Sequence, residues 1–91
     1  MVRVLPFDKK LGYPQRQRVK IGDKAYNIYY RWNSNGFAVL RIRRGDDGKL
    51  LYEGKVVRLN PVEVKDEYHS TLFVLLPWKV DEQNCEIWVF W

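Results

Sequence analysis

Few side chains in this 91-residue sequence form a pattern that is typical of a catalytic site. His69 is the only histidine and Cys85 the only cysteine. A His–Cys dyad would require these two residues, from separate loops, to meet within hydrogen-bond reach, and no third residue is obviously placed to orient the imidazole. We therefore expect a surface histidine, an unreactive cysteine and no catalytic residues.

Metal and cofactor sites have equally little support. One histidine and one cysteine fall short of the ligand set of a structural zinc site. Asp46 and Asp47 lie in a glycine-flanked turn, where aspartate is common because its side chain caps the backbone. No glycine-rich loop opens a helix, as phosphate-binding loops do. The sequence favours a non-enzymatic protein with no metal, no cofactor and no small-molecule substrate.

The composition is that of one small folded domain over residues 1–91. Hydrophobic residues make up 46% of the chain, enough for a packed core, and the 15% of aromatics also suits binding surfaces. The net charge of +5 permits attraction to nucleic acid or to acidic surfaces and equally suits a solvated exterior. We expect cytoplasmic synthesis, no internal disulfide, no signal peptide and no membrane insertion.

The distribution of glycine and proline along the chain indicates strands. Glycine and proline recur between segments rich in β-branched and aromatic residues, and helical periodicity is nearly absent. Strands are expected near residues 2–5, 15–21, 25–32, 37–44, 49–53, 55–59, 72–78 and 86–91. This spacing predicts an all-β fold, a small antiparallel β-sandwich or barrel of about seven or eight short strands built from hairpins.

Two turns predict the strand register in the first half of the chain. The Gly22-Asp23 pair suits a two-residue hairpin turn, which would set Val19 opposite Tyr26. A three-residue loop ending at Gly36 would then pair Asn33 with Phe37 and place an apolar column, Tyr26, Ile28, Tyr30 and Trp32, on one face. A four-residue loop would break that column, so we expect the three-residue loop.

The same register predicts a basic surface on the opposite side of these three strands. Its cations are Arg16, Arg18, Lys20, Arg31, Arg41 and Arg43. Such a surface could bind a nucleic-acid backbone, with Tyr29 available for stacking. However, the other aromatics face the core side, and acidic residues are scattered through the loops. Nucleic-acid binding is therefore the alternative function, and a solvated or protein-facing sheet is the main expectation.

The last two strands carry more apolar surface than the domain can cover. Residues 72–76 and 87–91 are apolar on both faces, and a domain of this size has too little interior to bury both. One face is expected to meet another subunit, because aromatic residues are the usual anchors of protein interfaces. The candidate interface residues are Trp88, Phe90, Trp91, Phe73 and Leu75.

The segment 19–33 resembles the opening of small phage baseplate proteins of the cyanophage baseplate plug type. The shared pattern is an apolar-x-apolar strand, a glycine turn, and then Tyr-x-apolar-x-apolar-Arg-Trp-Asn, which ends here at Asn33. A Gly36-Phe37 restart and a Gly-x-Leu-Leu step at 48–51 follow. The resemblance covers most of residues 4–59.

This resemblance implies a structural component of a contractile tail, found in the virion baseplate and assembled in the host cytoplasm. Its partners would be other tail or baseplate proteins or copies of itself. The resemblance carries over no catalytic residues. The matched positions Tyr26, Ile28, Tyr30, Trp32, Asn33 and Gly36 are implied to be scaffold, with the aromatics in the core and Asn33 starting the turn.

Overall fold

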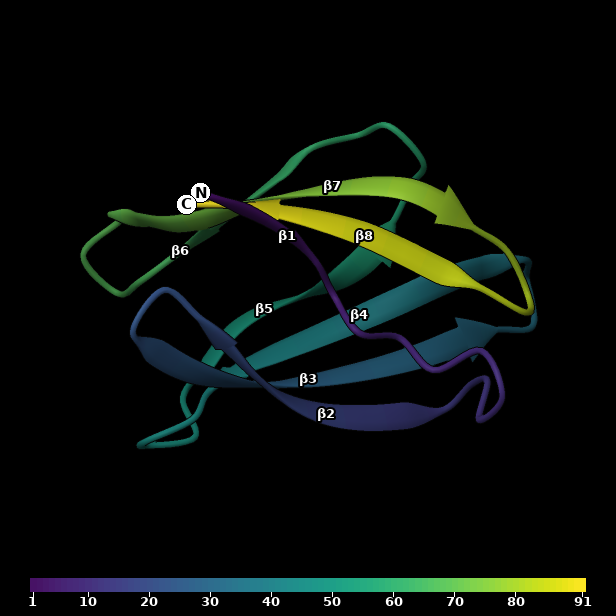
Figure 1. Ribbon diagram of the computed structural model, residues 1–91, viewed down its shortest axis with the longest axis horizontal. Coiled ribbons are helices and arrows are strands. Elements are labelled where there is room, and N and C mark those ends of the chain that lie inside the picture. The colour runs from purple at the N-terminus through teal and green to yellow at the C-terminus, as the bar shows by residue number, and fades with distance from the viewer.

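The computed structural model describes residues 1–91 as eight strands in two antiparallel four-stranded sheets. The upper sheet in Figure 1 has the order β1-β8-β7-β6 and the lower sheet the order β2-β3-β4-β5. The strands are β1 (Val2–Val4), β2 (Gln15–Ile21), β3 (Lys24–Asn33), β4 (Phe37–Arg44), β5 (Leu50–Val56), β6 (Val62–Lys65), β7 (Thr71–Val80) and β8 (Cys85–Phe90). The predicted all-β fold is confirmed, and its form is a β-sandwich.

The predicted register of β2, β3 and β4 is confirmed. Val19 pairs with Tyr26 across the first hairpin, and Asn33 pairs with Phe37 across the second. Gly36 has a φ of 95°, a left-handed conformation that glycine adopts without strain. The Asn33 side chain accepts a 2.8 Å hydrogen bond from the Asn35 amide, so it stabilises the turn that it starts.

The prediction for residues 49–65 is wrong in two places. The expected break near Gly54 does not occur, because β5 continues through it and Gly54 pairs with Leu40. A Cβ at Gly54 would lie 2.9 Å from the Tyr52 hydroxyl, so glycine is present for close packing and not for a turn. The expected strand at 55–59 is replaced by β6, a short edge strand whose Val64 is fully buried.

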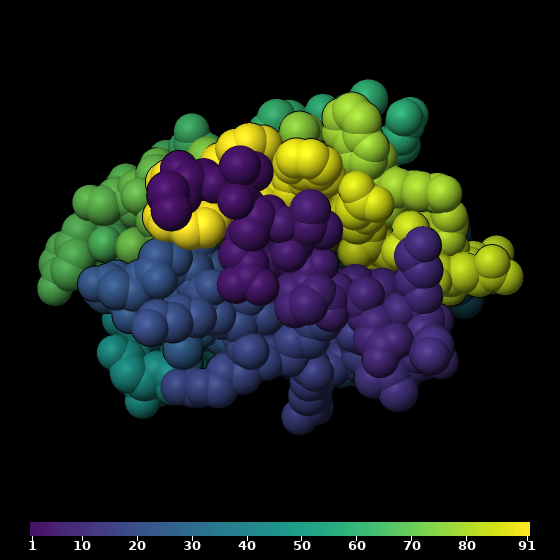
Figure 2. Space-filling view, viewed as in Figure 1, coloured from purple at the N-terminus to yellow at the C-terminus, as the bar shows by residue number.

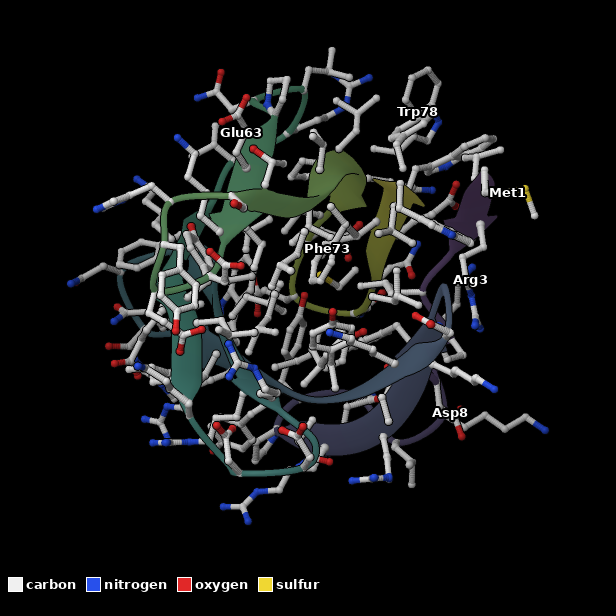
Figure 3. The ribbon with its side chains drawn as sticks, turned by 90° about the vertical axis from the view of Figure 1, so that its left-hand side faces the viewer. Met1, Arg3, Asp8, Glu63, Phe73 and Trp78 are labelled. Carbon is white, nitrogen blue, oxygen red and sulfur yellow. The ribbon has the colours of Figure 1, made fainter.

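One hydrophobic core of 16 buried residues fills the space between the sheets. The column formed by Tyr26, Ile28 and Tyr30 faces it from β3, as predicted, and the ring of Tyr26 meets that of Phe73 edge-on at 5.0 Å between centroids. Phe73 lies in the middle of the molecule in Figure 3. The sheets therefore pack through the alternate side chains of their strands, which leaves each sheet with one outward face.

The segment between β1 and β2 crosses from the upper sheet to the lower one along one side of the sandwich (Figures 1 and 2). Gln15 fastens this segment, because its amide donates to the carbonyls of Asp8 and Gly12 at 2.9 and 2.8 Å. The guanidinium of Arg3 adds a 2.8 Å bond to the carbonyl of Lys20. These contacts join the two sheets and so fix the positions of both outward faces. No helix long and apolar enough to cross a membrane is found.

Candidate binding faces on the two sheets

The two residues that could have formed a catalytic dyad lie at opposite ends of β7. His69 is exposed in the turn before this strand, whereas Cys85 pairs with Val80 at its far end. A ten-residue strand at ~3.3 Å per residue separates them by about 30 Å. Burial raises the pKa of the Cys85 thiol to about 11. No group of three or more His, Cys, Asp or Glu side chains is placed to hold a metal ion.

The outward side of the upper sheet carries an apolar face. It consists of Val2 and Val4 on β1, Trp88 and Phe90 on β8, and Val74, Leu76 and Trp78 on β7. The strand register arranges six of these side chains in two rows of directly opposed neighbours, Val2–Phe90–Val74 and Val4–Trp88–Leu76. Because opposed neighbours on one face touch, the apolar face is continuous over three strands.

The apolar face is open to solvent. Val2 is 52% exposed, Trp78 48% and Phe90 39%. Trp78 follows Val74 and Leu76 in the alternation along β7 and so points outward, and Figure 3 shows it on the outer side of the upper layer, away from Phe73. The borders are charged: Glu63 on β6 lies opposite Val74 and is also outward in Figure 3, and Glu86 accepts a 3.0 Å hydrogen bond from the Trp88 indole. A charged rim around an apolar centre is typical of a protein interface.

Three of the five predicted interface residues do not belong to this face. Phe73 and Leu75 are each 1% exposed and point into the core, since they alternate with the outward residues of β7. Trp91 packs against the turn between β2 and β3, where a Cβ on Gly22 would lie 3.4 Å from its ring. Trp88 and Phe90 are placed outward.

Sequence analysis missed five members of the apolar face: Val2, Val4, Val74, Leu76 and Trp78. Period-two alternation separates Phe73 and Leu75 from Val74 and Leu76, but both sets are apolar, so the pattern alone could not say which set faces inward. A charged residue on β6 could have distinguished the inward set from the outward set. Glu63 must point to solvent, and the register places it beside Val74.

The outward side of the lower sheet carries a basic face. Its cations are the six predicted ones, Arg16, Arg18, Lys20, Arg31, Arg41 and Arg43, together with Lys55, which sequence analysis missed. Lys55 pairs with Val39, and its ammonium lies 4.7 Å from the centre of the Phe37 ring. The register confirms that the predicted residues share one side of β2, β3 and β4.

Four arginines surround two uncharged side chains at the centre of the basic face. Arg16, Tyr29 and Arg41 are directly opposed across three strands, and Arg18, Asn27 and Arg43 form the next row. The guanidinium carbons of Arg16 and Arg41 lie 5.0 and 5.5 Å from the centre of the Tyr29 ring. These six side chains line an open hollow of about 470 Å³.

The central arginines are anchored but keep most of their hydrogen-bond donors. Arg41 donates through Nε to Glu53 at 2.7 Å, whereas Arg18 and Arg43 each donate one Nη1 bond to the carbonyls of Gly45 and Gly48. Each guanidinium has about five N–H groups. The arrangement therefore holds several arginines in place with donors left for an anion.

Charge is unevenly distributed over the molecule. The basic face has seven cations and one carboxylate, Glu53, for a net charge of +6. The other nine cations and ten carboxylates of the chain sum to −1. The acidic residues nearest to the basic face, Asp46 and Asp47, lie in the Gly45–Gly48 turn at its end. Comparisons with protein-family models, curated proteins and solved structures give no match.

Proposed function

We propose that this chain is a structural subunit that acts by assembly, with the apolar face of the upper sheet as its docking surface. The observation that carries the proposal is the continuous arrangement of Val2, Val4, Val74, Leu76, Trp78, Trp88 and Phe90 across three strands. Exposed apolar patches of this kind mark interaction sites in soluble proteins, because leaving them in water is unfavourable.

The occupant of the apolar face is a second copy of the chain. All seven members of the face are apolar, and interfaces between identical subunits are more apolar than those of transient complexes. Two-fold packing requires that the patch be complementary to itself, and the valine, leucine and aromatic side chains of two copies can pack against one another. The two copies would pack sheet to sheet, as the two layers of one subunit already do.

The resemblance of residues 4–59 to small phage baseplate proteins supports assigning this subunit to the baseplate of a contractile tail. The paired subunits would then be part of the virion, next to other tail proteins. Reading frames beside the gene test this assignment. Tail-tube, hub and baseplate genes in the same cluster are expected, and a cluster with no virion genes would count against it.

Sedimentation of the purified chain over a wide concentration range tests the docking surface. The wild type is expected to dimerise, and Phe90→Lys to weaken dimerisation by about 30-fold or more, as loss of an interface hot spot does. Tyr68→Lys is the matched control, because Tyr68 is 80% exposed in the turn between β6 and β7 and lies outside the face.

Thermal unfolding of the Phe90→Lys variant checks that its fold is intact. A wild type that stays monomeric at every concentration and binds no tail protein would overturn the proposal. So would a folded Phe90→Lys variant that dimerises as strongly as the wild type. Binding of a different tail protein to a monomeric chain would keep the assembly role but replace the occupant.

A further inference from the structure

The basic face has features that assembly through the apolar face does not use. The two faces lie on opposite sides of the sandwich, since they belong to different sheets. A solvated sheet face needs charge of either sign, yet this one has a net charge of +6 while the remainder of the chain has −1. Such segregation creates a local positive potential that attracts anions.

The geometry of the central arginines specifies the anion further. Arg16 and Arg18 follow one another on β2 at ~6.6 Å, and Arg41 and Arg43 do the same on β4, so that two rows run side by side. The rows are two strand spacings apart, ~9.6 Å, and β3 provides the floor between them with Asn27 and Tyr29. This is a trough with cations along both walls.

We propose that this trough binds single-stranded nucleic acid along β3. Two rows of spaced guanidiniums suit the repeated phosphates of one extended strand, and arginine donors pair well with phosphate oxygens. Bases can stack on the guanidinium planes that flank Tyr29, and the Asn27 amide offers a donor and an acceptor to a base edge.

A duplex fits the basic face less well than a single strand. Proteins read duplex DNA by placing a helix or a β-ribbon in its major groove, which is about 12 Å wide. The basic face is the side of a sheet, and its cations project from β2 to β5 without such an element. A duplex could touch the arginines only with its outer phosphates, and the floor of the trough would stay unused.

Fluorescence anisotropy with a labelled oligothymidine at several salt concentrations tests the proposal. If all four central arginines contact phosphates, the logarithm of the affinity should fall against the logarithm of salt with a slope of about −2.8. Arg18→Gln combined with Arg43→Gln should weaken binding by about tenfold per arginine and reduce the slope by about 1.4. Lys9→Gln combined with Lys10→Gln is the control, because it removes the same charge from an exposed loop off the basic face.

Each remaining outcome has a defined meaning. An equal loss in the lysine control would show that net charge alone attracts the oligonucleotide, which overturns the site. Equal affinity for a duplex of the same length would overturn the preference for a single strand. Binding of polyglutamate but not of oligothymidine would identify an acidic protein as the ligand and overturn the proposal.

This inference is independent of the proposed assembly. Phe90→Lys changes the apolar face on the other sheet and leaves the trough intact. With an oligothymidine too short to reach both troughs of a pair, that variant should bind with wild-type affinity per subunit, whether or not it still dimerises. The two proposals can therefore fail separately.

Discussion

The ring of Trp78 lies beside that of Trp88 on the outside of the upper sheet, with centroids 6.2 Å apart and planes inclined by 51°. The two residues come from neighbouring strands and lie diagonally on the outward face, since Trp88 pairs with Leu76, two positions before Trp78. Trp78 therefore extends the apolar face beyond the row formed by Val4, Trp88 and Leu76.

Phenylalanines on opposite faces of the upper sheet should respond differently to truncation. Phe73→Ala removes a core ring that is 1% exposed and should destabilise the fold by about 3–5 kcal/mol. Phe90→Ala removes a ring that is 39% exposed and should cost the isolated subunit clearly less. Urea unfolding of both variants at low protein concentration checks this. Equal losses would mean that Phe90 belongs to the core.

Gly45→Ala should destabilise the lower sheet and disturb the basic face together. A Cβ at this position would lie 2.6 Å from the Ala25 carbonyl oxygen and 3.1 Å from Nη1 of Arg18. The backbone cannot yield there without losing the bond from the Gly45 amide to Ala25, so a cost of about 1–3 kcal/mol is expected.

The control for Gly45→Ala is Gly12→Ala. Gly12 has open space around its Cα, and the cost there comes only from its φ of 62°. Chemical denaturation and amide exchange across β3 compare the two variants. A smaller effect at Gly45 than at Gly12 would contradict the close contact.

Acid should weaken the link between the two sheets at Glu67. Hydrogen bonds from Arg44 and Lys49, both at 2.9 Å, hold the pKa of Glu67 at about 2, below its ordinary 4.5. Because the folded pKa is lower than the unfolded one, the stabilisation is complete above about pH 4.5 and is lost as the pH falls toward 2. Glu67→Gln should show a shallower fall in urea midpoint over this interval, and parallel curves would refute the linkage.

Cys85 should resist thiol reagents until the fold opens. Its side chain is fully buried, and burial raises the thiol pKa to about 11, so that almost no thiolate is present at neutral pH. Labelling of the native protein should proceed only at the rate of unfolding and should accelerate in urea. Rapid labelling in the absence of denaturant would show that the end of the sandwich near Tyr13 opens locally.

Sequence patterns were sufficient for β2, β3 and β4 because the two faces of these strands differ chemically. Tyr26, Ile28 and Tyr30 alternate with Asn27, Tyr29 and Arg31, so only one register buries the apolar set. The arginine trough follows from the same register. Its anchoring bonds to Gly45 and Gly48 do not, because they depend on how the turn after β4 folds.

The upper sheet was harder to predict because both faces of β7 and β8 are apolar. Choosing Phe73 over Val74 as an outward residue was an error of one position, which moves every side chain to the other face. On β5 of the lower sheet, Gly54 wrongly predicted a break, since its role is to accommodate the Tyr52 ring inside a continuous strand. The position of Trp91 against Gly22 depends on a contact between residues far apart in the sequence that no local pattern encodes.

The placement of the apolar and basic faces on different layers has a consequence for valency. Two subunits joined through their upper sheets would present two arginine troughs, one on each outer side of the pair. Such a pair could hold two stretches of one anionic strand, and the second contact would form at high effective concentration. Two weak contacts, one at each trough, would then give the pair a higher overall affinity for the strand than either trough has alone.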